Sequence, residues 1–105
     1  MFDNSISPGN DVQETPVIPT GKIVTLKKFG GFDPRIGDYI DSIIALRWGS
    51  GGSWTTIRAG GQMFDLDLSI DFVGDGAKKF QIVRQNKSVV SKVIIAWVEA
   101  LVHDL

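Results

Sequence analysis

The chain has 105 residues, of which 43% are hydrophobic and 22% charged, and its formal net charge is −1. That length fits a single compact domain, and the balanced charge argues against nucleic-acid binding, which usually requires a basic surface. The chain has no Cys and a single His, His103, which argues against disulfides, thiolate or multi-histidine metal sites, and thiol- or imidazole-based catalysis. We therefore predict no cofactor and no enzyme activity.

The N-terminus lacks a basic region followed by an apolar one, so it does not read as a secretory signal. No stretch approaches the roughly 18–20 consecutive apolar residues that a membrane-spanning helix needs. The sequence predicts a soluble protein, or a mature chain from which a signal has been removed.

Residues 1–21 hold three acidic residues, no basic residue and three of the four prolines. Their apolar side chains are isolated and follow neither a helical nor a strand period, which predicts an extended arm. Such an arm is either a flexible tail or a segment that docks on a neighbouring subunit. The candidate anchors for docking are its apolar residues, Phe2, Ile6, Val17 and Ile18.

The remaining residues, 22–105, are predicted to form one β-sandwich domain. Its first three strands are expected over residues 22–29, 39–48 and 53–59. Glycine clusters follow these strands and are typical of turns, at 30–31, 49–52 and 60–61.

The clearest predicted element covers residues 62–73, where apolar and polar side chains alternate strictly. The apolar positions are Phe64, Leu66, Leu68, Ile70 and Phe72. A period of two over this length predicts a half-buried antiparallel strand.

The next strand is expected to pair with it as a hairpin over residues 62–85. Phe80 and Ile82 must share the buried face, which requires a loop with an odd number of residues. The three residues 74–76, Gly-Asp-Gly, fit such a loop and set Ile70 opposite Phe80.

The last segment, 89–102, fits either a strand or a helix with a polar stripe. Its heavy load of Val and Ile favours a strand over residues 89–98, and apolar residues on both faces suggest a central one. The predicted fold class is therefore all-β, a small antiparallel β-sandwich or barrel (jelly-roll or immunoglobulin-like) with an extended N-terminal arm.

Three acidic residues, Asp65, Asp67 and Asp71, form a stripe on the polar face of the alternating strand. Residues two apart on a strand lie about 6.5–7 Å apart, which suits a hard-cation site or a catalytic carboxylate pair. However, Ile70 stands where a calcium loop requires glycine, so a solvated sheet face is favoured and a metal site is only a weak candidate.

The aromatic residues Trp48, Trp54 and Tyr39 are the second candidate site, for contact with a protein partner or a glycan. The two tryptophans flank the glycine-rich turn and could oppose one another at its mouth. Trp48 shares its face with apolar residues of its strand, which favours a place in the core.

A short all-β domain behind a proline-spaced arm resembles small virion accessory proteins, such as phage decoration or tail components, in outline. We predict a non-enzymatic structural protein that associates with itself or joins a larger assembly, without nucleic acid or a membrane span. The alternative is a carbohydrate-binding module that uses the exposed aromatics.

Overall fold

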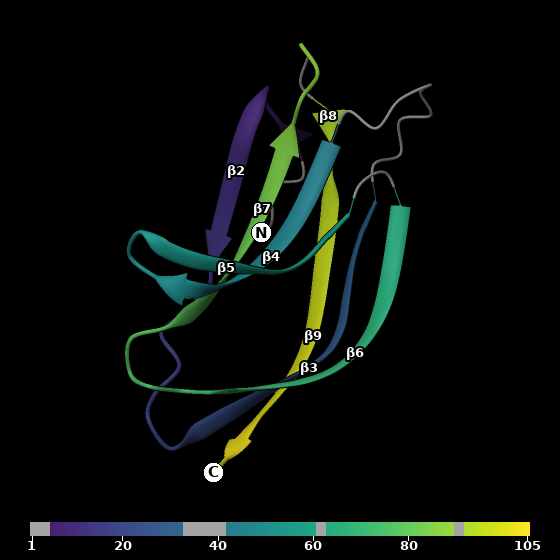
Figure 1. The fold of residues 1–105 in the computed structure, drawn as a ribbon. Coiled ribbons are helices and arrows are strands. Elements are labelled where there is room, and N and C mark those ends of the chain that lie inside the picture. Colours follow the sequence, from purple (N-terminus) through teal and green to yellow (C-terminus); the bar gives the residue numbers. More distant parts are fainter. Residues whose placement is uncertain (1–4, 33–41, 61–62, 90–91) are drawn as a thin grey trace.

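The computed structural model describes residues 5–32, 42–60, 63–89 and 92–105, and it is an all-β sandwich of two antiparallel sheets (Figure 1). The strands of the described residues are β1 (Ser5–Ile6), β2 (Gly9–Glu14), β3 (Lys22–Phe32), β4 (Ser42–Ser50), β5 (Ser53–Gly60), β6 (Met63–Val73), β7 (Lys79–Asn86), β8 (Lys92–Val93) and β9 (Ile95–Asp104). The predicted antiparallel β-sandwich is confirmed.

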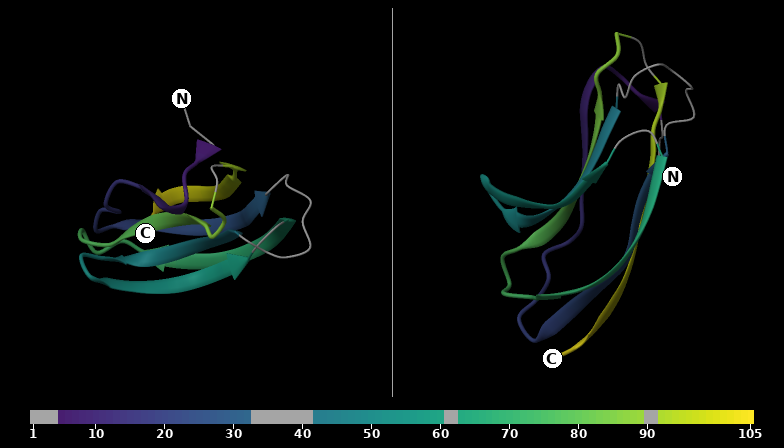
Figure 2. Two further views of the ribbon diagram at one scale, coloured as in Figure 1. Left: turned by 90° about the horizontal axis from the view of Figure 1, so that it is seen from above. Right: turned by 45° about the vertical axis from the view of Figure 1, so that its right-hand side comes forward.

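One sheet has four strands in the order β2-β7-β4-β5, and the other has three in the order β6-β3-β9. The short strands β1 and β8 pair separately. The β4–β5 hairpin extends away from the body of the sandwich, as the right-hand view of Figure 2 shows. Four strands therefore lie at sheet edges: β2, β5, β6 and β9.

The core lies between the two sheets. It consists of Ile6, Val24, Leu26, Phe29, Ile44, Leu46, Phe80 and Ile94. Aromatic rings from both sheets meet there, with the ring centroids of Trp48 and Phe80 4.6 Å apart. The Phe72 ring from the opposite sheet lies edge-on to Phe80 at 5.2 Å. Burial of apolar surface between the layers is the main stabilising term for such a fold.

Strand β6 confirms the predicted alternation. From Phe64 to Val73, the even-numbered side chains are half-buried and the odd-numbered ones are exposed. Its apolar face packs on the core and its acidic face meets solvent, because a period of two matches the pleat of a strand.

The predicted hairpin between β6 and β7 is wrong. Strand β6 pairs with β3, whereas β7 pairs with β2 and β4 in the other sheet. Residue parity correctly places Phe72 and Phe80 in the interior, but the two rings face each other across the sandwich. The same pattern of burial arises whether two strands are neighbours in one sheet or lie opposite each other in two.

Backbone contacts of the loop after β6 favour the passage of the chain from one sheet to the other. Gly74 N donates to Lys22 O at 2.8 Å, and Gly76, with φ of 81°, donates to Ile18 O at 3.0 Å. The Asp75 carboxylate accepts hydrogen bonds from the backbone N–H groups of Lys78 (2.8 Å) and Ala77 (2.9 Å). These two bonds, that of Lys78 first, hold the pKa of Asp75 below its ordinary value of 3.8.

Strand β3 does not end at its glycine pair, as the sequence predicted, but continues through it to Phe32. A Cβ at Gly30 would overlap the Trp97 ring, and one at Gly31 would overlap the Ile44 side chain. These glycines are required by close packing on the two faces of the sheet, not by a turn. The glycine-rich turn after β4 is likewise shorter than predicted, because Ser50 pairs with Ser53 and only residues 51–52 connect the strands.

The C-terminal segment is a strand, as favoured, and the helical alternative is rejected. It is not a central strand, however, because β9 pairs with β3 alone among the described residues and lies at the edge of its sheet. Its apolar side chains on both faces are therefore largely exposed, and they were misread as a sign of burial.

Part of the predicted arm belongs to the sandwich, since β2 pairs with β7 over its whole length. Polar contacts rather than apolar periodicity hold it there. The buried Arg84 of β7 donates to Asp11 Oδ2 at 2.7 Å, and Lys79 forms an ion pair with Glu14 at 3.3 Å. The acidic charge of the arm is thus matched by basic residues of the adjacent strand.

Candidate functional site

The candidate site is the free edge of β9 together with the apolar groove beside it. Side chains of β9 alternate between the groove and the outer face of the sheet. Val98, Ala100 and Val102 line the groove. On the outer face, Leu101 is 56% exposed, and on the groove side Val102 is 62% exposed. An exposed apolar strand of this length is unusual in a protein that stays monomeric.

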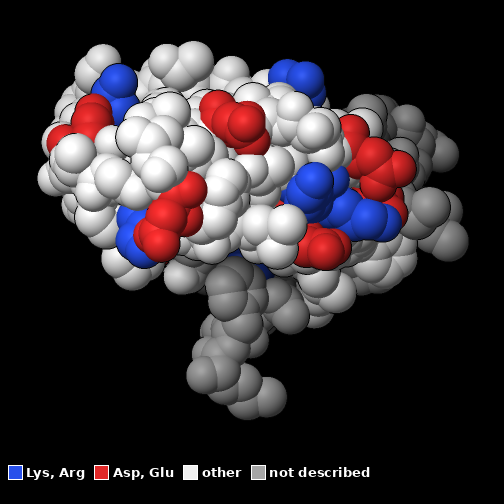
Figure 3. Space-filling view, turned by 90° about the horizontal axis from the view of Figure 1, so that it is seen from below, with Lys and Arg blue, Asp and Glu red and all other residues white. Residues whose placement is uncertain are grey.

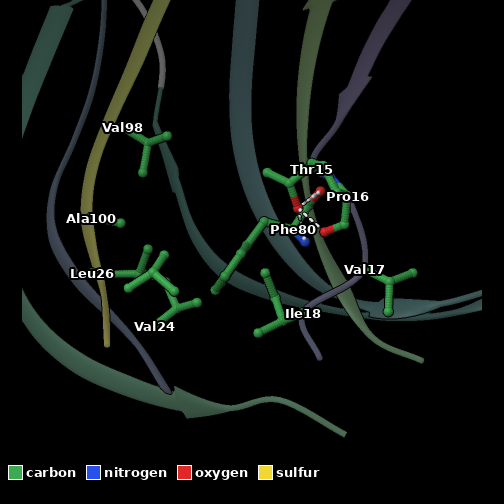
Figure 4. A pocket seen from close by; sticks show the side chains of 10 residues that line it. Thr15, Pro16, Val17, Ile18, Val24, Leu26, Phe80, Val98 and Ala100 are labelled. Atoms are coloured by element: carbon green, nitrogen blue, oxygen red, sulfur yellow. Dashed lines mark hydrogen bonds between the residues drawn. The ribbon is translucent and has the colours of Figure 1, made fainter. Parts of the chain in front are cut away.

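The groove has a volume of about 320 Å³. Its lining is apolar except for Thr15 and comprises Thr15, Pro16, Val17, Ile18, Val24, Leu26, Phe80, Val98, Ala100 and Val102. Figure 4 shows Val98 and Ala100 on one side, Thr15 to Ile18 on the other, and Phe80 between them. Its floor is formed by the buried side chains of Val24, Leu26 and Phe80, and Val17, Val98 and Val102 are exposed at its margins.

Backbone hydrogen bonds fix the wall of the groove opposite β9. Thr15 N donates to Phe80 O at 3.0 Å, and Thr15 Oγ1 accepts from Phe80 N at 3.0 Å. Ile18 N donates to Lys78 O at 2.9 Å. The wall is therefore an ordered part of the sandwich.

On the outer face of this sheet, side chains of β9 reach across β3. The Trp97 ring lies over Gly30, and its Nε1 donates to Asp65 Oδ1 at 3.4 Å. Nearer the C-terminal end of β9, Thr25 Oγ1 lies 3.1 Å from His103 Nε2 and donates to Asp71 at 2.6 Å. These contacts hold Trp97 and His103 against the sheet, and the other backbone edge of β9 pairs with no strand among the described residues.

The predicted acidic stripe is spread along β6 and each carboxylate has a separate partner. Asp65 accepts from Trp97, Asp71 accepts from Thr25, and Asp67 forms an ion pair with Lys28 at 3.6 Å. Among the described residues, no group of three or more His, Asp or Glu side chains is placed to hold a metal ion. The stripe is arranged as a solvated sheet face.

The two candidate tryptophans are not brought together. Trp48 packs against Phe72 and Phe80 in the core. Trp54 lies opposite Gly49, not Trp48, and its Nε1 donates to Gly51 O at 2.7 Å. Tyr39 lies outside the described residues. The two tryptophans therefore form no shared platform for a ligand.

The candidate arm anchors have different positions. Ile6 is buried in the core of its own chain, and Ile18 packs against that core. Val17 is 42% exposed at the groove. Phe2 lies outside the described residues. The arm anchors of the described segment thus contact the sandwich of their own chain.

Sequence reasoning missed two important features of this region. The first is the exposed edge of β9, whose signal was present as apolar residues on both faces of a terminal strand. The second is Arg84, only 1% exposed, whose Nη1 donates to Ile94 O at 2.9 Å. Nothing in the local pattern of β7 distinguishes this buried arginine from a solvated one.

Charged side chains on the lower face of the molecule form small mixed groups. Figure 3 shows acidic and basic side chains side by side on the lower face, with uncharged surface between them. The ion pair of Lys22 with Asp104 and that of Lys78 with Asp75 are examples of such pairing. This face presents no field of a single sign that would attract a highly charged partner.

Comparisons with known proteins add an outline only. No protein-family model and no curated protein matches the chain. The crystal structure of the Yersinia pseudotuberculosis-derived mitogen is similar at a TM-score of 0.47 and 15% identity, covering 92% of this chain and 88% of that one. A likeness of this size carries no inference about activity. The described part of the chain contains no helix suited to crossing a membrane.

Proposed function

We propose that this chain is a non-enzymatic assembly protein that associates with copies of itself through the β9 edge. The observation that carries the proposal is the concentration of exposed apolar surface at one strand. Of ten large hydrophobic side chains that are exposed among the described residues, five lie between residues 97 and 105. They are Trp97, Val98, Leu101, Val102 and Leu105.

Comparison with the other edge strands supports this choice. Natural proteins protect sheet edges with charged residues, short strands or covering segments. Strand β6 carries three aspartates on its exposed face, and β2 and β5 are built largely from polar residues and glycine. Strand β9 is ten residues long, and apart from Glu99, His103 and Asp104 all of its residues are apolar. A second β-sheet edge is the partner that satisfies both its unpaired backbone groups and its apolar side chains.

The polar residues of the described chain give no support to catalysis. The aspartates of β6 are exposed and separately paired, and the tryptophans form no platform for a sugar ring. The narrower role as a component of a virion stays a prediction from the outline of the chain.

The test compares two lysine substitutions at exposed valines on edge strands. Val102→Lys places a charge in the proposed interface, whereas Val12→Lys places the same charge on β2, where Val12 is 47% exposed. We expect the wild type and Val12→Lys to associate, and Val102→Lys to sediment as a monomer with an unchanged circular dichroism spectrum. A wild-type chain that remains monomeric up to millimolar concentration contradicts the proposal, as does equal association of all three proteins.

A further inference from the structure

The free edge of β9 fits a second copy of the same strand in one particular register. We infer that two β9 strands pair antiparallel around a two-fold axis at Leu101, which sets Glu99 of each chain opposite the partner's His103. The inference rests on the self-association proposed above and names its partner and its geometry. The three-stranded sheets of two chains are thereby joined into one continuous sheet.

The two faces of β9 limit the possible registers. Val98, Ala100 and Val102 face the groove, whereas Trp97 and His103 contact outer-face residues of the sheet. In a pair of β9 strands, the apolar groove residues stay on one face only if each even-numbered residue lies opposite an even-numbered residue of the partner. In a symmetric antiparallel pair, the axis must then pass through a residue that faces its own copy.

Backbone hydrogen bonding imposes the same condition. The N–H and C=O groups of a strand point alternately toward one neighbour and the other, again with a period of two. The groups of β9 that point away from β3 therefore belong to residues of one parity. An axis through a residue matches these groups in the two copies, and an axis between two residues does not.

The charge of Glu99 then distinguishes among the possible positions of the axis near the middle of the strand. An axis at Glu99 sets two carboxylates against each other, which is unfavourable for directly opposed residues. An axis at Ala100 sets Glu99 opposite an apolar residue, Leu101. An axis at Leu101 sets Glu99 opposite His103 of the partner subunit twice, once on each side of the axis. An axis at Val98 sets Glu99 opposite Trp97, whose indole N–H already donates to Asp65 within its own chain. Among the axes from Val98 to Leu101, only that at Leu101 sets the carboxylate opposite a side chain that can carry a positive charge.

The surroundings of these side chains within one chain are compatible with the pairing. Glu99 lies beside Lys28 in the register of β3, and His103 contacts Thr25. Both neighbours belong to β3, on the side of β9 away from the free edge. At the axis, the exposed Leu101 is covered by its own copy, and Ala100 lies opposite the partner's Val102. The register therefore covers apolar surface and sets Glu99 opposite His103 at the same time.

Single cysteines test this register because the chain contains none. Directly opposed residues in an antiparallel pair have Cα atoms about 4.5–5.5 Å apart, which lies within disulfide range. We expect Leu101→Cys to form a cross-linked dimer on mild oxidation at least about tenfold faster than Ala100→Cys or Glu99→Cys. Each variant is compared at equal concentration, with the solution mass of the reduced protein measured beside it.

The outcomes separate this inference from the proposed function. Faster cross-linking at Ala100→Cys or Glu99→Cys moves the axis and overturns the register, while self-association through β9 stands. A dimer that cross-links at none of the three positions overturns the register as well. Monomeric mass for the wild type and every reduced variant overturns both the register and the proposed function.

Substitutions at His103 provide a second, non-covalent test. His103→Glu opposes two carboxylates on each side of the axis, and we expect the dimer dissociation constant to rise roughly tenfold. His103→Arg keeps a donor opposite Glu99 and is the matched control, with an affinity equal to or tighter than that of the wild type. Equal weakening by the two substitutions, or no effect of either, contradicts the proposed pairing.

Discussion

The attachment of β2 depends on a buried arginine, and removing its acidic partner is the sharpest test of the fold. Arg84 has a side chain that is 1% exposed and donates from Nε and Nη2 to Asp11 Oδ2 at 3.1 and 2.7 Å. The substitution Asp11→Ala removes this acceptor and leaves the buried guanidinium with less compensation. We expect β2 to loosen and the free energy of unfolding to fall.

The size of the effect follows from the burial of the pair. Breaking a fully buried ion pair by removing one partner costs about 3–5 kcal/mol, because a buried charge is left uncompensated. The Asp11 side chain is 31% exposed, so solvent screens part of the interaction. We therefore expect a loss of about 2–3 kcal/mol, which for a domain of this size lowers Tm by roughly 10 °C or more.

Urea denaturation at fixed protein concentration measures this loss, since association would otherwise contribute to apparent stability. Glu14→Ala is the matched control on the same strand. It removes a partly exposed ion pair with Lys79 and a 3.3 Å hydrogen bond from Gln81, and we expect it to cost about 1 kcal/mol. Asp11→Ala combined with Arg84→Met removes the buried charge, and we expect it to be more stable than Asp11→Ala alone.

Two results would refute this reasoning. If Asp11→Ala is no more destabilising than Glu14→Ala, Arg84 does not depend on Asp11 in solution, and residues 9–14 are a detachable arm. If the double variant is less stable than Asp11→Ala, the guanidinium stabilises the sandwich through its other contacts, such as that with Ile94 O.

Two further predictions concern single residues. Gly30→Val would force the Trp97 ring off the sheet and destabilise the fold by about 1–3 kcal/mol. Chemical denaturation followed by tryptophan fluorescence measures this loss. Gly52→Ala is the control, because its added Cβ meets open space and should have little effect. Asp75→Ala removes the acceptor of the loop, whereas Asp75→Asn keeps an acceptor oxygen. Because the folded pKa of Asp75 is lowered, its contribution is present above pH 3.8 and is lost as pH falls through the folded pKa. The difference in Tm between wild type and Asp75→Ala should therefore be largest at pH 6 and shrink progressively as the pH is lowered below 3.8. A difference that stays constant with pH would contradict this cause.

Side-chain periodicity predicted which residues form strands better than it predicted which strands lie next to each other. The alternation from Phe64 to Phe72 identifies β6 because a half-buried strand has no other simple pattern. The same alternation does not distinguish a Phe80 that lies beside Phe72 in one sheet from a Phe80 that faces it from the opposite sheet. That choice depends on the backbone contacts of residues 74–78 with residues 18–22, which are long-range and leave no local signal.

The predictions of a turn at the glycine pair and of a central C-terminal strand were wrong for the same physical reason. Gly30 and Gly31 read as a turn, but the space for their side chains is occupied by Trp97 and Ile44 from elements distant in sequence. The apolar faces of β9 suggested a buried strand, although nothing in the described part of the chain covers them. In both cases the missing information is the identity of a neighbour, which for the glycines lies in a distant part of the chain and for β9 is the proposed second copy.

Amide hydrogen exchange along β9 tests self-association through this edge most directly. The proposed interface predicts that exchange of residues 95–104 slows as protein concentration rises, while exchange in β5, an edge strand of the other sheet, stays constant. The backbone amides that point away from β3 should account for the change, since only they gain hydrogen bonds from the partner. Exchange in β9 that is equally fast at all concentrations, or concentration-dependent protection confined to another strand, would contradict the account.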